Sequence, residues 1–571
     1  MGARRSGSSW IRSNTGILKE RANMSFMLVV MFFAVFGLIV LTEIFLIDDK
    51  HSGGISSGLN GHRFGPKLSS APDRPDYEEI GLVDYTSLKG GLEERLSMLV
   101  RGAELKGALA AAMPIDPRSL SSIPINLEAR LPQLDKSLRI THAEWLPVTN
   151  TRFKFFVYSA YYDERVGGGI IRNHGSNSGV IRVIGATKTR GPEKVWCRLW
   201  YLHNSNNITT SITVAAKVKV IRENWNLKYS ACFVICPLPK ESHSLSTEQI
   251  PEAVSIVARL RASPTNRIVV QNRPVDRPKH RQSLAVCIKP LHYDYNRVLQ
   301  LVEFIELHKI LGASHVTLYN DSLGSDAGCA LNYYEGKGLV TLLPWHHLDM
   351  ISQREIRTEG LFAALNDCLY RSMYTYEYLA LLDLDEFIIP RHEDTILDLI
   401  RLISRRSSSK TASAYSFQNA FFYLQWPDDP YVTTRRNIEA SLVTLRKTRR
   451  RSKLHPHKQR SKYVCRPRDI IETGNHFVWE FIPGHGAVNV PADEAILHHY
   501  RVCEFGGDDC IKTASVIDRT AYKYLDKLAE QVEITWQQLI KMCPNIPNLK
   551  PVTFEVSKAA HNELNIRKSA R

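Results

Sequence analysis

Two aspartates, one residue apart, give the chain its clearest chemical signal. Residues 378–390 read YLALLDLDEFIIP, so Asp383 and Asp385 come directly after an apolar run. Such a run is typical of a buried parallel strand, and ligands of open α/β sheets bind beyond the carboxyl ends of these strands. Because side chains alternate along a strand, both carboxylates can face one Mn²⁺ or Mg²⁺ ion, which also binds phosphate oxygens. The pattern favours a metal-assisted site for a nucleotide diphosphate. In the alternative interpretation, the two acids cap a helix or pair with lysine.

The elements that must position these acids begin near residue 281, where strand-like runs alternate with helical patterns. Along the chain they read SLAVCIKPL, RVLQLVEFIELHKILG, HVTLYNDS, GLVTLLPW, a helical pattern around residues 360–372, and YLALLDLDEFIIP. Strand, helix and strand in succession predict an α/β fold with a mainly parallel sheet, flanking helices and right-handed crossovers. We expect this domain to span residues 281–540 and a C-terminal tail to follow at 541–571.

A β-rich region precedes this domain at residues 151–280. Its runs RFKFFVYSAYY, GVIRVIGA, VWCRLWYL, SITVAAKVKVI and SACFVICPL are separated by Gly, Asn and Pro turns. This spacing predicts an antiparallel accessory domain. Residues 48–150 are rich in Gly, Ser and Pro, which is typical of a stem or linker.

An apolar segment near the start of the chain predicts a membrane anchor. Residues 24–47 would span roughly 36 Å as a helix, against a hydrocarbon core of about 30 Å. Basic residues precede the segment and Asp48 and Asp49 follow it, so the positive-inside rule places residues 1–23 in the cytoplasm and the remainder in a lumen. The alternative is a cleaved secretory signal, but the length and the missing small-x-small cleavage site favour a single-pass type II signal-anchor in the lipid bilayer.

A lumenal location makes the ten cysteines candidates for disulfides, although their spacing does not determine the pairing. Structural zinc is disfavoured because Cys232 with Cys236, and Cys503 with Cys510, lack the tight C-x2-C spacing of a zinc site. Asn207 begins the triplet Asn-Ile-Thr and is a predicted glycosylation acceptor.

Composition bounds the remaining function classes. At 571 residues and 44% hydrophobic content, the chain is too long and too apolar for a small module or a disordered tail. The net charge of +16 favours acidic partners without choosing among them. Residues 446–462, RKTRRRSKLHPHKQRSK, resemble a nucleic-acid patch, but the lumenal topology and the lack of aromatic residues within the run argue against nucleic acid as a partner. We expect a mobile, solvated loop near the site that attracts an anionic substrate or a membrane surface.

Several spaced blocks carry a family resemblance. They are VCIKPL at 286–291, LVEFIELHKILGASHVTLYNDS at 301–322, LNDCLYR at 365–371, LLDLDEFIIP at 381–390, SKYVCRP at 461–467, His476, and HHYR at 498–501. In this order they resemble glycosyltransferase family 92. The resemblance implies a GT-A-like fold and metal-dependent, inverting transfer of galactose from UDP-galactose to fucose or galactose on a glycoprotein N-glycan. It also implies a β-1,4-galactosyltransferase of the Golgi membrane with a lumenal catalytic domain.

The resemblance and the strand ends together suggest roles for particular residues. Asp383 and Asp385 are the predicted metal ligands, and the resemblance adds His499, with His498 as the alternative. The predicted contacts to the donor nucleotide or its diphosphate are Lys289, Asp294, Asp321, Asp367, Asp383, Lys462 and Arg466. For Asp367, a structural role is an equal alternative.

Inversion requires a general base that takes the proton of the acceptor hydroxyl. Glu480 and Asp493 are candidates because they fall between His476 and the HHYR block, and His476 is a third. An inactive, glycan-binding membrane protein remains the alternative function, and a homodimer is conceivable as a partner arrangement.

Overall fold

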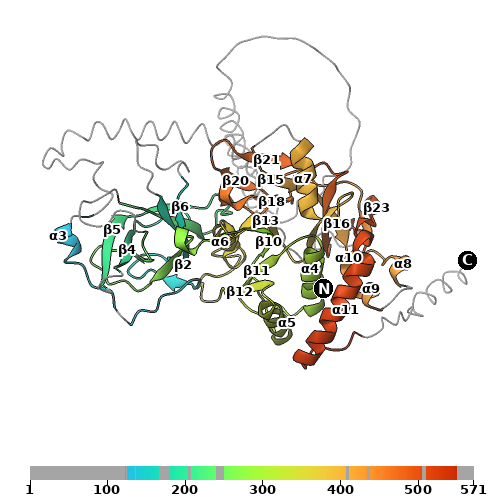
Figure 1. The fold of residues 1–571 in the computed structure, drawn as a ribbon, viewed down its shortest axis with the longest axis horizontal. Helices are drawn as coiled ribbons and strands as arrows, with labels where there is room; N and C mark the ends of the chain where they lie inside the picture. The colour runs from blue at the N-terminus through green and yellow to red at the C-terminus, as the bar shows by residue number, and fades with distance from the viewer. Residues whose placement is uncertain are drawn as a thin grey trace, which may run out of the picture. The chain divides into compact units, whose positions relative to one another are not determined.

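The computed structural model describes residues 123–549, with short gaps (Figure 1). The gaps are residues 124, 136, 166–178, 204–207, 240–249, 407–410, 434–436 and 504–508. The predicted anchor at 24–47 and Asn207 lie outside the described residues, so both stay predictions. Within the described ranges, no helix is both long and apolar enough to cross a bilayer.

The first third of the described chain forms one nine-stranded sheet. Its strands are β1 (Leu146–Pro147), β2 (Phe156–Asp163), β3 (Val180–Lys188), β4 (Trp196–His203), β5 (Ile208–Ala215), β6 (Lys217–Val220), β7 (Tyr229–Pro237), β8 (Ala253–Val257) and β9 (Ile268–Gln271). The order is β5-β4-β8-β9-β2-β3-β7-β6, with β1 paired to β2, and only β2 and β9 run parallel. We call this the accessory sheet.

A seven-stranded sheet starts at β10, close to the boundary expected near residue 281. Its strands are β10 (Gln282–Ile288), β11 (His315–Asn320), β12 (Val340–Pro344), β13 (Tyr376–Leu382), β15 (Ala412–Phe417), β18 (Lys462–Cys465) and β21 (Gly486–Asn489). The order is β12-β11-β10-β13-β18-β15-β21. Strands β10 to β13 are parallel, as predicted, whereas β18 runs antiparallel to both of its neighbours. We call this the central sheet.

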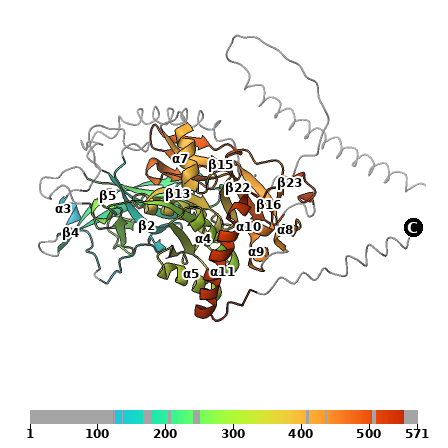
Figure 2. The same ribbon diagram turned by 45° about the vertical axis from the view of Figure 1, so that its right-hand side comes forward.

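Helices cover both faces of the central sheet. They are α4 (Val298–Ile310), α5 (Ser325–Gly336), α6 (Leu361–Ser372), α7 (Ile396–Arg406) and α11 (Leu525–Met542). In β10, Leu284 and Val286 face the layer of α4 and α11, while Ala285 and Cys287 face α6. This alternation explains the continuous apolar run, because both faces of a parallel strand are buried. Helices α4 and α11 pack side by side (Figure 2).

The accessory sheet shares a core with the central sheet. Tyr158, Tyr161 and Phe233 of β2 and β7 pack in one buried cluster with Leu365 and Tyr370 of α6. The two sheets belong to one compact unit, Asp76–Arg571. Helix α6 therefore has the central sheet on one side and the accessory sheet on the other.

A three-stranded sheet and a hairpin complete the edge where β13 ends. The sheet has the order β14-β22-β16, from β14 (Glu386–Pro390), β22 (Ala495–Arg501) and β16 (Asn419–Tyr423). The hairpin pairs β19 (Ile470–Thr473) with β20 (Val478–Phe481). Strands β14 and β22 are antiparallel, and their register sets Glu386 opposite His499.

The basic run is folded, which corrects the expected mobile loop. Its first residue ends helix α10 (Val443–Arg446), and three later residues form β17 (Arg449–Arg451), which pairs with β23 (Ser515–Ile517). Lys447 contacts Asp428 at 2.6 Å and Arg450 contacts Asp518 at 2.8 Å. Acids outside the run thus pair with some of its basic residues.

Eight of the ten cysteines form disulfides, as the lumenal reading allowed. The pairs are Cys197–Cys236, Cys287–Cys368, Cys329–Cys543 and Cys503–Cys510, while Cys232 and Cys465 are buried free thiols. Cys329 lies in α5 and Cys543 directly follows α11. The folded domain therefore continues past residue 540, where the sequence predicted a tail.

Candidate active site

The turn between β13 and β14 fixes the acids of the predicted motif. The amide of Asp383 donates to Glu386 Oε2 at 3.0 Å, and the amide of Glu386 donates to the Asp383 carbonyl at 3.1 Å. These two bonds close a tight turn directly after a buried strand. Asp383, Asp385 and Glu386 therefore lie at the carboxyl edge of the parallel strands, where the sequence placed the site.

Asp383 contacts two lysines. Its Oδ2 accepts from Lys289 Nζ at 2.6 Å and from Lys462 Nζ at 3.3 Å. Lys289 follows β10, the parallel neighbour of β13, and Lys462 begins the antiparallel β18 on the other side. Burial acts against ionisation, but the two lysines together hold the pKa of Asp383 well below its usual range. Its Oδ1 is buried and has no hydrogen-bond partner among the residues that the structure describes.

Lys462 is the buried cation at the centre of this cluster, with a side chain only 1% exposed. It contacts Glu386 Oε2 at 3.1 Å and donates to Asn475 Oδ1 at 2.9 Å, in addition to Asp383. Burial disfavours the ammonium, yet the carboxylates of Asp383 and Glu386 raise the pKa of Lys462 above its ordinary value. The cluster thus contains a charged lysine ammonium that can also donate to a diphosphate oxygen.

His499 lies between two carboxylates. Its Nε2 is 3.4 Å from Asp385 Oδ2, its Nδ1 is 3.5 Å from Glu386 Oε1, and the Asn419 amide nitrogen is 3.0 Å from Nδ1. Burial disfavours the imidazolium, but Asp385 and then Glu386 raise the pKa of His499. The carboxylate at Nδ1 orients the ring and leaves Nε2 facing Asp385.

These residues fit a divalent cation with two protein ligands. Asp385 and His499 present a carboxylate oxygen and an imidazole nitrogen to each other, a donor set that suits Mn²⁺, and Glu386 supports the ring from behind. Across the part of the chain that the structure describes, no three His, Cys, Asp or Glu side chains could hold a metal ion by themselves. Asp383 directs its Oδ2 to the two lysines, and joint ligation by Asp383 and Asp385 stays a prediction.

His498 does not compete with His499 for this role. Successive side chains of β22 point to opposite sides, so His498 faces the core, where it stacks on Phe422 and its Nδ1 lies 3.1 Å from Tyr500 Oη. Burial lowers the pKa of His498 to about 3.

Asp294 and Asp321 lie beyond β10 and β11, on the same edge as Lys289. Asp294 pairs with the Ser322 hydroxyl, and the Asp321 amide donates to the Leu291 carbonyl at 3.0 Å. Burial, and then the charge of Glu359, raise the pKa of Asp321. Tyr293 precedes Asp294 with a positive φ of 58° and is 75% exposed. This loop therefore presents an aromatic ring and two acids at the edge.

Two predicted donor contacts lie elsewhere. Strand β18 runs antiparallel to β13, with Lys462 at its start. Arg466 follows the other end of β18, about 13 Å further along the chain. There it donates to the hydroxyl of Tyr378, near the start of β13. Asp367 is fully buried in α6, where its carboxylate accepts from Tyr161 Oη at 2.6 Å, Tyr319 Oη at 2.8 Å, the Ser159 hydroxyl and the Arg371 guanidinium. Neither is available to a nucleotide at Asp383, and Asp367 has the structural role.

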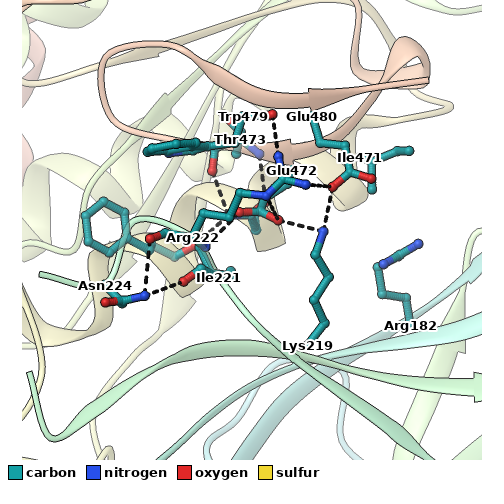
Figure 3. Close-up of polar contacts among 12 residues, drawn as sticks. Arg182, Lys219, Ile221, Arg222, Asn224, Ile471, Glu472, Thr473, Trp479 and Glu480 are labelled. Atoms are coloured by element: carbon teal, nitrogen blue, oxygen red, sulfur yellow. Dashed lines mark hydrogen bonds and ion pairs between the residues drawn. The ribbon is translucent and has the colours of Figure 1, made fainter. Parts of the chain in front are cut away.

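Glu480 is bound by cations of the accessory sheet (Figure 3). Its Oε2 contacts Lys219 Nζ at 2.7 Å and Arg222 Nη2 at 2.5 Å, while Lys219 also contacts the buried Glu472 at 2.7 Å. Burial acts to raise the pKa of Glu480, but the two cations lower it below its ordinary value. A carboxylate held this way is a poor general base near neutral pH, so Glu480 ties the β19–β20 hairpin to the accessory sheet instead.

Asp493 also lies away from the cluster. It is exposed and precedes β22 at the Ala495 end, whereas His499 lies about 13 Å further along the same strand. Asp493 is therefore not the base.

His476 is the predicted base that does lie at the site. It occupies the turn of the β19–β20 hairpin, where its Nδ1 is 3.1 Å from the Ser461 carbonyl and its Nε2 is 3.1 Å from the Asn475 amide nitrogen. Since Asn475 accepts from Lys462, this turn adjoins the lysine-bound Asp383.

Glu223 is a site residue that the sequence did not reveal. It comes from the loop after β6, and its Oε2 accepts from the Asn475 amide at 2.9 Å and from Trp479 Nε1 at 3.1 Å. Burial raises the pKa of Glu223, although the nearby charges of Lys289 and Lys462 oppose the shift. No local pattern marks Glu223, because only the packing of the accessory sheet on the hairpin brings it here.

The fold and the site together define an α/β protein with an acidic and basic cluster at the carboxyl edge of its parallel strands. Residues 282–543 match the sequence model of glycosyltransferase family 92. This part of the chain belongs to that family, which confirms the resemblance.

Two relatives from Caenorhabditis elegans match parts of the chain. Glycosyltransferase family 92 protein F13G3.3 is 31% identical over 144 residues, which cover 24% of this chain and 28% of that protein. Beta-1,4-galactosyltransferase galt-1 is 22% identical over 243 residues, which cover 41% of this chain and 51% of that protein. The chain thus spans about half, or less, of the length of these curated relatives.

Solved structures give only remote matches. Glucosyl-3-phosphoglycerate synthase from Mycobacterium tuberculosis, in complex with Mn²⁺, UDP and glucosyl-3-phosphoglycerate, is 10% identical with a TM-score of 0.19, over 47% of this chain and 81% of that chain. Mannosyltransferase PcManGT from Pyrobaculum calidifontis, with GDP-Man and Mn²⁺, is 12% identical with a TM-score of 0.22, over 52% of this chain and 82% of that chain. At such scores neither adds to the description of the fold.

Proposed function

We propose that the protein is a metal-dependent, inverting glycosyltransferase that transfers galactose from UDP-galactose to a fucose or galactose hydroxyl of a glycoprotein N-glycan. The observation that carries the proposal is the facing pair of Asp385 and His499 beside the lysine-bound Asp383. Carboxylate, imidazole and ammonium groups converge where a nucleotide diphosphate is bound in open α/β sheets. Family membership supports the reaction class, and the similarity to galt-1 supports the choice of galactose and the β-1,4 linkage.

The chain's own residues divide the work at the donor. Asp385 and His499 would hold Mn²⁺ or Mg²⁺, which supplies Lewis-acid stabilisation of the leaving diphosphate. Lys289 and Lys462 place two ammonium groups at the same point and stabilise the negative charge that develops on the diphosphate. The exposed Tyr293 and the acids Asp294 and Asp321 bind the nucleoside end of the donor.

The acceptor side lies at the hairpin turn. Inversion requires removal of the acceptor proton as the hydroxyl attacks the anomeric carbon. We assign this proton to Glu223, because its raised pKa suits a general base and it adjoins the turn beside Lys462. His476, in the same turn, orients the acceptor hydroxyl.

Location and assembly are part of the proposal. The apolar segment 24–47 would anchor the protein in the Golgi membrane as a single-pass type II protein with its catalytic domain lumenal, and a homodimer is compatible with this arrangement. The disulfides support an oxidising compartment.

The test is a transfer assay on the purified protein. A panel of UDP-sugars is offered with fucosylated or galactosylated N-glycans in Mn²⁺ or EDTA, and product mass is measured. We expect one hexose to be added from UDP-galactose only with metal. If no sugar nucleotide turns over while glycans bind equally well in EDTA, the protein is the glycan-binding alternative.

A further inference from the structure

A cavity of about 360 Å³ opens at the opposite edge of the central sheet from the candidate active site. Strand β13 runs from Tyr376 towards Asp383, and the cavity is lined by residues that flank the beginnings of β10 and β13 and the end of β18. Its polar lining consists of Arg165, Arg281, Arg466 and Arg468 with the acids Glu377 and Asp469. We call it the arginine cavity.

Arg165 builds the wall of this cavity. Its guanidinium donates to both oxygens of Asp163, at 2.8 and 3.1 Å, and its Nη1 donates to the carbonyls of Arg468 at 3.0 Å and Ile470 at 2.5 Å. The loop that carries Arg466 and Arg468 is thereby fixed to β2 of the accessory sheet. Asp163 neutralises Arg165, so we assign this arginine a structural role and not a ligand-binding one.

The other three guanidinium groups form no direct ion pair with a carboxylate among the described residues, although the charge of Asp469 acts on Arg466 and that of Glu164 acts on Arg468. Arg466 donates to Tyr378 Oη at 3.1 Å, Arg468 lies 5.2 Å from the centre of the Tyr374 ring, and Arg281 makes no hydrogen bond or ion pair within the described ranges. Tyrosine contacts leave the N–H donors of an arginine largely unused.

The acids of the lining offset part of these charges without pairing directly with an arginine of the cavity. Asp469 accepts from the Ser413 hydroxyl at 2.7 Å and lies 3.5 Å from His485 Nδ1. Glu377 is exposed at the start of β13. Three arginines that form no direct ion pair therefore line one cavity, and their guanidinium groups keep N–H donors for a ligand.

We propose that the arginine cavity binds the oxyanion of a sugar-sized ligand, meaning a monosaccharide unit that bears a carboxylate, phosphate or sulfate. Guanidinium groups present paired N–H donors that match such oxyanions. The volume lies at the lower end of small-molecule pockets, which suits a monosaccharide better than a bare ion. The proposal concerns a second site and does not depend on the transferase reaction.

Calorimetric titration of the full-length protein tests this site. The probes are glucuronic acid, glucose 6-phosphate and galactose 6-sulfate, with neutral galactose and inorganic phosphate as comparisons. We expect saturable binding of at least one anionic sugar, weaker in high salt, and clearly weaker binding of galactose and of inorganic phosphate. The preferred probe identifies the source of the oxyanion.

Matched variants localise the binding. Arg466→Gln and Arg468→Gln should each weaken it about tenfold or more, since each removes charge-assisted hydrogen bonds, and Arg466→Lys should also weaken it because the paired donors are lost. Arg401→Gln, which removes an exposed arginine of α7, and Asp385→Asn at the candidate active site should leave it unchanged. Thermal melts verify that each variant is folded.

Three outcomes overturn the proposal. They are the absence of saturable binding by every anionic sugar, binding that the folded Arg466 and Arg468 variants retain at full strength, and equal affinity for galactose or inorganic phosphate. Loss of binding in Asp385→Asn would assign the anion to the candidate active site instead.

Discussion

Glu386 stands directly opposite His499 in the pairing of β14 with β22, and its Oε1 lies 3.5 Å from the ring Nδ1. The residue before Glu386 in the chain, Asp385, is instead 3.4 Å from the other ring nitrogen. One turn and one strand register therefore give a single imidazole a supporting carboxylate on one side and a potential metal partner on the other.

The first prediction concerns this pair. Asp385→Asn should lower transfer by about 100-fold or more, because a metal ligand is lost, and should remove the difference between Mn²⁺ and EDTA. Product mass with UDP-galactose measures both effects. Asp493→Asn is the matched control, since Asp493 is exposed at the far end of β22, and it should retain full activity. Full metal-dependent activity in Asp385→Asn would contradict the assigned site.

Lys462 offers a test by stability. Lys462→Met removes the cation that contacts the buried Glu386 and leaves Asp383 with Lys289 alone. The free energy of unfolding should therefore fall by about 3–5 kcal/mol. Urea denaturation measures the change. Lys453→Met at an exposed position should change stability by no more than about 0.5 kcal/mol. Equal stability of the two variants would show that the cluster is not held by Lys462.

Asp367 should matter for folding and not for chemistry. Asp367→Asn removes the charge that pairs with Arg371 and accepts from three hydroxyls of β2 and β11, so we expect a loss of about 3–5 kcal/mol. The variant that remains folded at low temperature should keep the wild-type KM for the donor. A raised KM for the donor without a loss of stability would show that Asp367 contributes to nucleotide binding.

The local sequence pattern was sufficient to predict that the acids lie at the carboxyl edge of the sheet. It was not sufficient to predict which side chains surround them. The apolar run before Asp383 predicted a buried parallel strand, and alternation along that strand is local. The direction of β18 is set by pairing with β13 and β15, so SKYVCRP could not reveal that Lys462 and Arg466 point to opposite edges. Turn formation also reorients Asp383 and Asp385, which a strict strand period cannot anticipate.

Long-range packing decides the remaining roles. Glu480 pairs with Lys219, and Glu223 reaches Asn475. In each pair the two residues are more than 200 positions apart in the chain. The family resemblance marked Asp367 and Arg466 as members of shared blocks. It did not say whether a block builds the fold, a nucleotide site or a second cavity.

A buried histidine predicts how stability depends on pH. His308 packs between Phe304 and Phe387, and burial lowers its pKa to about 4. The unfolded chain, with an ordinary pKa near 6.5, binds the proton first, so stability is fully present above about pH 6.5 and is lost as the pH falls towards 4, by about 3 kcal/mol in all. His308→Leu should remove this contribution and leave that of the buried His498, whose pKa is also lowered, whereas His142→Leu at an exposed position should leave both in place. Urea denaturation at pH 7 and pH 4.5 compares the three proteins, and an unchanged pH dependence in His308→Leu would exclude His308 as its source.

The general base is tested by the shape of the pH–rate profile. Glu223→Gln keeps the size of the side chain but cannot take a proton, so kcat should fall by about 100-fold or more and the acidic limb of the profile should disappear. UDP affinity should be retained, because the metal ligands and lysines are untouched. His476→Gln should raise the acceptor KM while leaving the acidic limb in place, since His476 orients the acceptor. Glu193→Gln, which alters another carboxylate of the accessory region that accepts from backbone amides, provides the control and should leave both kcat and the profile unchanged. If Glu223→Gln retains its acidic limb, the carboxylate only holds the hairpin through Asn475 and Trp479, and the proton must go to a different group.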